Sequence, residues 1–224
     1  MSTGYITFLV LALLPFPAAL DDASKDILLG IDFGSEWIKL VIVSQGSRVE
    51  TVLNENSKRK TLSAILLPDP GNDIPRIFGE AAVSRPHKSL LYVRELLGMS
   101  HSRKGTYGPH HYQSSITADE RRGACIIRRD GTSYSPEILN AMLLVYAKVR
   151  AEEHTGKNVT KCVITVPPYF NSLQRLALLS AARIAGVFTS FRLSFVHDLL
   201  RLKCRVHRFV ASQRWGSGGN QVRP

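Results

Sequence analysis

An acid, a glycine and a hydroxyl stand close together between two apolar runs near the start of the chain. In LLGIDFGSEWIKLVIVSQG, residues 28–46, the apolar runs are joined through Asp32, Gly34 and Ser35. A plain hairpin turn explains these residue types, because Asp, Gly and Ser favour turns. The same types also suit a phosphate, since glycine lets backbone N–H groups approach an oxygen and the hydroxyl donates a further bond. The hairpin alone leaves both explanations open.

The cysteines and histidines indicate no other chemistry. Cys125, Cys162 and Cys204 are far apart and lack a CxxC spacing, so they predict neither a disulfide framework nor a zinc site. His110 and His111 are adjacent in a Gly/Pro-containing stretch, a context typical of solvated polar residues rather than metal ligands.

The first residues are typical of a targeting segment. Ile6–Leu14 is an apolar run, followed by prolines and small residues. A bilayer span needs about 20 apolar residues, so the run suits a signal peptide better than a stable membrane anchor. We predict a signal peptide over residues 1–23, cleaved between Ala18 and Ala23; an uncleaved anchor or a buried helix is the alternative. In a secretory lumen the sequon at Asn158 would be a glycosylation site.

The positive charge is concentrated at the end of the chain. The 224 residues carry a formal charge of +11, and residues 183–224 hold 8 basic residues against 1 acidic residue. No motif or folded module accompanies this basic stretch, so we expect no nucleic-acid partner. We predict that residues 187–224 are a divergent basic tail of irregular structure.

The second half of the chain has the clearest helix and strand signals. Ser135 followed by proline and glutamate predicts a helix start, and Gly156 predicts its end. The apolar run KCVITVPP, residues 161–168, is typical of a strand buried on both faces. Asn171 then caps a second helix that ends near Gly186.

Hairpin signals dominate the first half. Asp130-Gly131 between short strand-like runs predicts a hairpin turn. We also expect helical stretches on either side of Pro86. Hairpins followed by helix, strand and helix predict an α/β fold with a mixed sheet and flanking helices.

Four motifs in this order resemble the nucleotide-binding domain of the seventy-kilodalton heat-shock protein family. They are DFGS at residues 32–35, then RIFGEAA, then SPEIL, then VITVPPYFN with QR and AARIAG. The likeness covers residues 27–186. Ordinary members of the family carry two threonines and an aromatic where this chain has Ser-Glu-Trp. This difference, together with NSKRKT and the leader, makes the chain similar to the large endoplasmic-reticulum branch of the family, the hypoxia up-regulated and glucose-regulated chaperones.

The resemblance implies a fold and a function. Residues 24–186 would be the first lobe of an actin-like ATPase fold of the ribonuclease H-like type, incomplete because the second phosphate hairpin and the adenosine-binding segment belong to the other lobe. The implied function is that of an ATP-binding molecular chaperone in the endoplasmic reticulum lumen. ATP or ADP and Mg²⁺ would be its cofactors, and unfolded or nascent polypeptides and other lumenal chaperones its partners.

The resemblance also implies roles for individual residues. It assigns nucleotide contacts in the hairpin to Asp32, Gly34, Ser35, Glu36 and Trp37. Asp32 would face Mg²⁺ through water, since Mg²⁺ keeps much of its hydration shell. Arg94, in RELLG, stands where the family has its catalytic lysine, and it keeps the charge but not the compact ammonium. We therefore expect the isolated chain not to hydrolyse ATP, and we expect it to bind ATP weakly because one lobe supplies only part of the family's nucleotide contacts.

Two alternatives stay open. One is a small-molecule kinase of the actin-like superfamily, whose hairpin would bind ATP in the same way. The motif VITVPPYFN followed by QR favours the chaperone, because a kinase needs acidic residues placed for a hydroxyl nucleophile and none is evident. The other alternative is a non-functional gene fragment.

Overall fold

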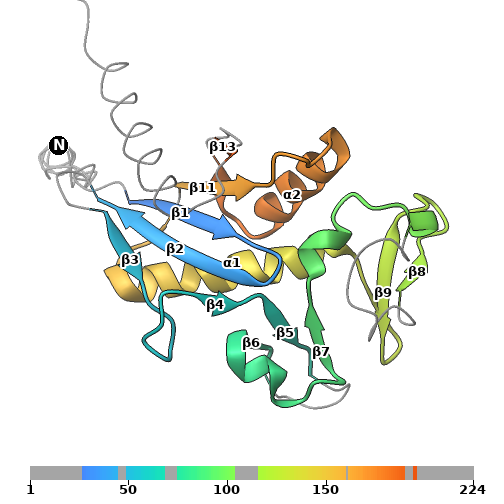
Figure 1. Ribbon diagram of the computed structural model, residues 1–224, viewed down its shortest axis with the longest axis horizontal. Helices are drawn as coiled ribbons and strands as arrows, with labels where there is room; N and C mark the ends of the chain where they lie inside the picture. Colours follow the sequence, from blue (N-terminus) through green and yellow to red (C-terminus); the bar gives the residue numbers. More distant parts are fainter. Residues whose placement is uncertain are drawn as a thin grey trace, which may run out of the picture.

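A computed structural model describes residues 27–44, 49–68, 75–103, 116–159, 161–189 and 194–195. The predicted signal peptide at residues 1–23 and most of the predicted tail lie outside these described residues. Figure 1 shows the described part as a layer of strands crossed by one long helix, with two smaller groups of strands beside it.

The elements follow one another in a simple order. The strands are β1 Leu28–Phe33, β2 Trp37–Val43, β3 Glu50–Val52, β4 Thr61–Leu62, β5 Ala64–Leu66, β6 Ile77–Phe78, β7 Ser89–Leu91, β8 Ile116–Ala118, β9 Cys125–Arg129, β10 Thr132–Tyr134, β11 Lys161–Val166, β12 Phe188–Thr189 and β13 Ser194–Phe195. The helices are α1 Pro136–Thr155 and α2 Ser172–Ile184, with short 3-10 helices at Gly79–Ser84, Val93–Leu96 and His101–Arg103.

The largest sheet is mixed, as the sequence predicts. Its strands lie in the order β12-β11-β1-β2-β3, with β4 also paired to β2 and β13 to β11. The hairpin β1–β2 and the pair β2–β3 are antiparallel, whereas β1 pairs with β11 in parallel. A parallel neighbour requires a crossover, and α1 provides it. The strand β1 is therefore held on one side by a local hairpin and on the other by a distant segment.

The core of this sheet is formed by β1 and β11. Leu29, Ile31 and Phe33 of β1 are almost completely buried, and the last five residues of β11 are buried too. A continuous apolar run suits a strand covered on both faces, because no position faces water. The burial of β11 confirms the prediction that residues 161–168 include a strand buried on both faces.

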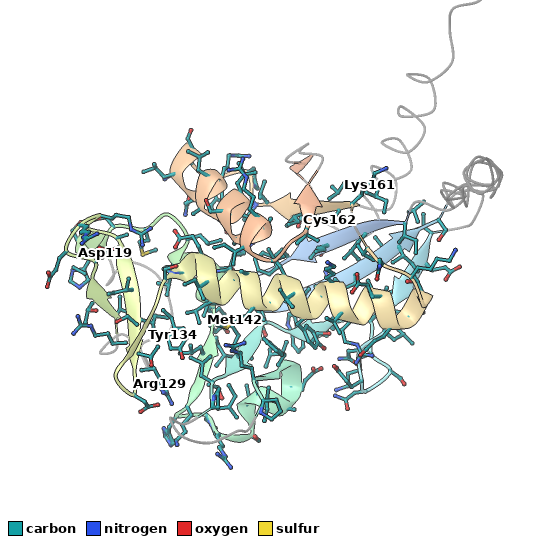
Figure 2. The ribbon with its side chains drawn as sticks, turned by 180° about the vertical axis from the view of Figure 1, so that it is seen from behind. Asp119, Arg129, Tyr134, Met142, Lys161 and Cys162 are labelled. Atoms are coloured by element: carbon teal, nitrogen blue, oxygen red, sulfur yellow. The ribbon has the colours of Figure 1, made fainter. Side chains whose placement is uncertain are left out.

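Both long helices begin and end where their capping residues predict. The Ser135 side chain accepts a hydrogen bond from the N–H of Ile138, and Gly156 takes a left-handed conformation with φ of 66°. Asn171 and Gln174 form a reciprocal capping box at the start of α2. Figure 2, seen from behind, shows α1 lying along the main sheet, and α1 and α2 pack against each other.

Two three-stranded antiparallel sheets complete the described part, in the orders β10-β9-β8 and β6-β5-β7. The β9–β10 turn holds Asp130 at φ of 48° and Gly131 at φ of 78°. Two successive positive φ values match the turn that two-residue hairpins prefer. The predicted hairpin is confirmed.

The structure differs from the expectation of helices around Pro86. A 3-10 helix at Gly79–Ser84 precedes the proline, and strand β7 follows it before the 3-10 helix at Val93–Leu96. β7 pairs with β5, with Leu90 opposite Ile65, and both side chains are fully buried. The burial gained by pairing overrides the helical preference of these residues.

The sheet also extends beyond Gly186, where an irregular segment is expected. Val187 is buried, and β12 and β13 pair in parallel with β11. The open edge of β11 supplies the N–H and C=O groups to which these short strands bond. The prediction of an irregular segment is wrong for these residues, and the rest of the predicted tail lies outside the described residues.

Candidate functional site

The β1–β2 turn is closed by its own backbone. The N–H of Gly34 donates to the carbonyl oxygen of Trp37 over 3.0 Å. A Cβ atom added at Gly34 would overlap that same oxygen. The close approach of the two backbone segments therefore requires glycine at this position, whether or not a ligand binds to the turn.

Arg94 lies directly beside this turn. Its guanidinium donates to the carbonyl oxygen of Phe33 over 2.9 Å and to the hydroxyl of Ser35, and the side chain is 7% exposed. Tyr92, with φ of 57°, takes a left-handed conformation just before the 3-10 helix that presents Arg94. The guanidinium also lies 5.5 Å from the centre of the Phe170 ring. Arg94 is thus held by backbone, hydroxyl and aromatic contacts.

Burial changes the acid–base properties of Arg94 without removing its charge. Burial lowers the pKa of the guanidinium, and the neighbouring Tyr169, Glu95 and Asp32 offset part of that effect. Arginine remains protonated at neutral pH even so, because its ordinary pKa is so high. A buried positive charge therefore stands next to the turn.

Asp32 is held from two sides. Lys39 Nζ lies 2.9 Å from one carboxylate oxygen, and the hydroxyl of Thr165 donates to the other over 3.1 Å. The same hydroxyl accepts a bond from the N–H of Phe33. Asp32 and Lys39 are direct cross-strand partners in the β1–β2 register, so the ion pair follows from the hairpin itself.

These residues line one cleft of about 370 Å³, which is bounded by the turn, by Lys39 and Arg94, and by the end of β11 with the residues that follow it. The cleft brings together every residue to which the sequence assigns a nucleotide contact or a catalytic position: Asp32, Gly34, Ser35, Glu36, Trp37 and Arg94. Asn158 is exposed in the loop between α1 and β11, apart from this cleft. Larger cavities, of about 680 and 470 Å³, lie along α1 and contain none of these residues.

The chemistry of the cleft fits a polyphosphate. Two cations, Lys39 and Arg94, and the hydroxyl of Ser35 can all donate to phosphate oxygens. The Nε atom of Arg94 is buried without a hydrogen-bond partner. Glu36 is exposed, so its carboxylate can stay in water rather than face the anion.

The same cleft fits a divalent metal poorly. Both oxygens of Asp32, the only other carboxylate lining it besides Glu36, already accept bonds from Lys39 and Thr165. Within the described ranges, no group of three or more His, Cys, Asp or Glu side chains could hold a metal ion. A water-bridged Mg²⁺ at Asp32 stays a prediction that these contacts do not favour.

Two residues of the cleft, Lys39 and Thr165, were not singled out in the sequence. Lys39 could have been found from the hairpin register, because counting outward from the turn pairs it with Asp32. Thr165 had a weaker signal, as one hydroxyl in the apolar run of β11. Its contact with Asp32 depends on the pairing of strands 133 residues apart, which local patterns do not specify.

The cysteines of the described part take no role in this chemistry. Cys125 and Cys162 are buried. Burial raises the pKa of the Cys162 thiol to about 12, so it stays protonated at neutral pH. Figure 2 shows Cys162 beside Lys161 on β11. A buried neutral thiol is a weak nucleophile.

Comparison with known proteins relates the chain to one family over most of its length. The Hsp70 protein family matches residues 28–193. Hypoxia up-regulated protein 1 of Danio rerio is 34% identical over 194 residues, covering 84% of this chain and 19% of the relative. The Homo sapiens protein of the same name is 34% identical over 186 residues, covering 80% and 18%.

A fungal relative gives a similar result. Heat shock protein 70 homolog lhs1 of Schizosaccharomyces pombe is 36% identical over 168 residues, covering 70% of this chain and 19% of the relative. The chain thus spans about a fifth of the length of these relatives. No helix in the described part of the chain is long and apolar enough to cross a membrane.

Proposed function

This chain belongs to the Hsp70 family, and from that premise we propose that residues 24–186 form the first lobe of an Hsp70-type nucleotide-binding domain. The family implies the actin-like ATPase fold, and the mixed sheet with its flanking helices is consistent with it. The cleft at the β1–β2 turn would receive the phosphates of ATP or ADP. Family membership favours this function over that of a small-molecule kinase.

One observation carries the proposal. The Gly34–Ser35 turn, the buried Arg94 and the end of β11 line the same cleft, although they come from three distant parts of the chain. Lys39 and Arg94 give that cleft two positive charges, and phosphate oxygens are bound best by charged donors. When bound, the nucleotide would supply a transferable phosphoryl group; the chain's own residues would hold and orient the phosphates.

Arg94 is proposed as the counterpart of the family's catalytic lysine. Its guanidinium is already bonded to Phe33 and Ser35. A group held in this way stabilises the turn and the phosphate charge but is poorly suited to follow a reacting phosphoryl group. We therefore infer that the isolated chain does not hydrolyse ATP.

The wider role is proposed from the resemblance to the lumenal branch and from its relatives. The chain would contribute to an ATP-binding chaperone in the endoplasmic reticulum lumen that acts on unfolded or nascent polypeptides with other lumenal chaperones. The exposed position of Asn158 supports its use as a glycan acceptor. Translation with microsomes tests this part: loss of residues 1–23 and an endoglycosidase-sensitive mass gain are expected, and an unmodified product would contradict it.

The nucleotide proposal is tested by separating the parts of ATP. The ¹⁵N-labelled chain is titrated with ATP, tripolyphosphate and adenosine, and the amide signals of Gly34 and Ser35 are followed. Because the adenosine-binding segment belongs to the other lobe of the family's domain, tripolyphosphate should shift these signals almost as strongly as ATP, with dissociation constants on the order of millimolar. Adenosine should not shift them.

Two outcomes would contradict the proposal. One is the absence of any shift at Gly34 and Ser35 with either phosphate compound. The other is binding of adenosine alone with the affinity of ATP, which would indicate a nucleoside site elsewhere. A phosphate-release assay on the same samples tests the expected lack of hydrolysis.

A further inference from the structure

We propose that Lys39 supplies the charge that a divalent cation would otherwise bring to this cleft, so that the chain binds the polyphosphate without Mg²⁺. This inference rests on the proposed function and specifies the form of its ligand: the metal-free nucleotide polyphosphate. It starts from the poor fit of the cleft to a metal.

The position of Lys39 is built into the hairpin. Asp32 and Lys39 are paired residue to residue across β1 and β2. Cross-strand partners project to the same face of a sheet, with Cβ atoms about 4.5–5.5 Å apart. The register therefore places the two side chains within reach of each other, and Lys39 Nζ lies 2.9 Å from the Asp32 carboxylate.

Asp32 is held in turn so that it orients Lys39. The hydroxyl of Thr165 donates to its second oxygen, and Thr165 is buried. Because both oxygens of Asp32 are already bonded, they have fewer free lone pairs to accept hydrogen bonds from a metal-bound water than an unpaired carboxylate has. An Asp32 fixed in this way acts as a positioning residue for the ammonium.

Lys39 keeps the capacity to bind an anion. An ammonium has three N–H donors, and one of them is bonded to Asp32. The Lys39 side chain is 33% exposed and lines the cleft together with Arg94. Lys39 and Arg94 bring two positive charges to the lining, and Asp32 and Glu36 bring two negative charges. Lys39 thus offsets the Asp32 carboxylate, as a divalent cation at this position would.

The experiment compares phosphate binding with and without metal. The ¹⁵N-labelled chain is titrated with ATP and with tripolyphosphate, once in excess EDTA and once in excess Mg²⁺, and the Gly34 and Ser35 amides are followed. The dissociation constants in the two buffers should agree within about threefold. A weakening of tenfold or more in EDTA would overturn the inference and restore a metal role for Asp32.

Substitution of the lysine gives the second test. Lys39→Met removes the ammonium but keeps a long side chain, and it should weaken binding in EDTA by about tenfold to a hundredfold, the worth of one charge-assisted bond. Mg²⁺ should recover part of that loss, because Asp32 is released. Lys39→Arg should retain metal-free binding, and unchanged binding by Lys39→Met in EDTA would contradict the inference.

A matched control and a fold check make these results specific. Lys58→Met removes the same charge from an exposed loop residue that does not line the cleft, and it should leave both dissociation constants unchanged. The amide spectrum of each variant reports whether the lobe is folded. Absence of phosphate binding by the unaltered chain in both buffers would overturn the proposed function itself, and with it the role of Lys39.

Discussion

Two groups of charged side chains in the described part of the chain, one in the cleft and one on α1, differ in burial. In the cleft, Arg94 is 7% exposed and bonds to a backbone carbonyl and a hydroxyl. On α1, Arg150 bonds to Glu55 over 3.1 Å and to Glu153 over 2.9 Å, and these two carboxylates are 50% and 54% exposed. Tyr146 also donates to Glu55 there.

The comparison shows why similar bonds contribute differently to stability. When a partner is removed from the cleft, the remaining polar group stays buried and unsatisfied, at a cost of about 1–3 kcal/mol. On α1, water can replace a lost partner, so an exposed ion pair contributes about 0–1 kcal/mol. Substitutions in the two groups should therefore differ severalfold in effect.

The largest effect is expected at the turn that opens the cleft. Gly34→Ala places a Cβ against the carbonyl oxygen of Trp37, and backbone atoms cannot move aside cheaply. We expect a loss of about 3 kcal/mol or more in the free energy of unfolding, with loss of phosphate binding. Urea denaturation measures the first and NMR titration the second.

The control for this prediction is Gly131→Ala, at a turn glycine that has open space around it and, unlike Gly34, a positive φ. Its cost should be only about 1 kcal/mol, from backbone strain alone. Equal losses for the two variants would show that close approach at Gly34 costs no more than backbone strain at Gly131, which would contradict the prediction.

The next effect concerns the buried guanidinium. Arg94→Met keeps much of the volume but leaves the Phe33 carbonyl and the Ser35 hydroxyl without their donor. We expect a destabilisation of about 2–3 kcal/mol by denaturant unfolding. Arg122→Met, which removes an exposed pair with Asp119, should cost less than about 1 kcal/mol; a comparable loss there would contradict the contrast.

A smaller effect is expected from a single hydroxyl. Thr165→Val preserves shape but removes the bonds to Asp32 and to the N–H of Phe33. We expect a loss of about 1–2 kcal/mol, because both former partners are at least partly buried. Thr132→Val, at an exposed position of β10, serves as the control and should change the unfolding free energy by less than about 0.5 kcal/mol.

The smallest effect is expected on α1. A double-mutant cycle of Arg150→Ala and Glu55→Ala should give a coupling below about 1 kcal/mol that falls further at high salt. Burial alone would raise the pKa of Glu55, but hydrogen bonds and Arg150 hold this pKa below its ordinary value. Its contribution is therefore present above that value and is lost as the pH falls through the lowered pKa. A coupling larger than the loss expected for Arg94→Met would reverse the comparison.

Much of the fold could be predicted because its signals are local. Ser135, Gly156 and Asn171 mark helix ends through bonds to residues three or four positions away, and the structure confirms all three. The prediction of a helix directly after Pro86 was wrong, because the strand β7 found there depends on pairing with β5. The sequence around a strand does not specify which distant strand it will pair with.

The candidate site divides in the same way. The residues of the turn are adjacent in sequence, and Arg94 was placed beside them only through the resemblance. Lys39 and Thr165 act on Asp32 across a strand pair and across a parallel crossover. The functional assignments of all these residues stay predictions, which the titrations above would test.

The pairing of β1 with β11 also determines when the cleft can form. The N–H of Phe33 bonds to the Thr165 hydroxyl, 132 residues later, and such distant contacts slow folding. During synthesis the β1–β2 hairpin leaves the ribosome long before β11 does. In that interval one edge of the apolar strand β1 has no partner, and an unpaired apolar edge is prone to aggregation. Until α1 and β11 have been synthesised, a nascent chain would therefore need protection from aggregation at the same strand that lines the cleft.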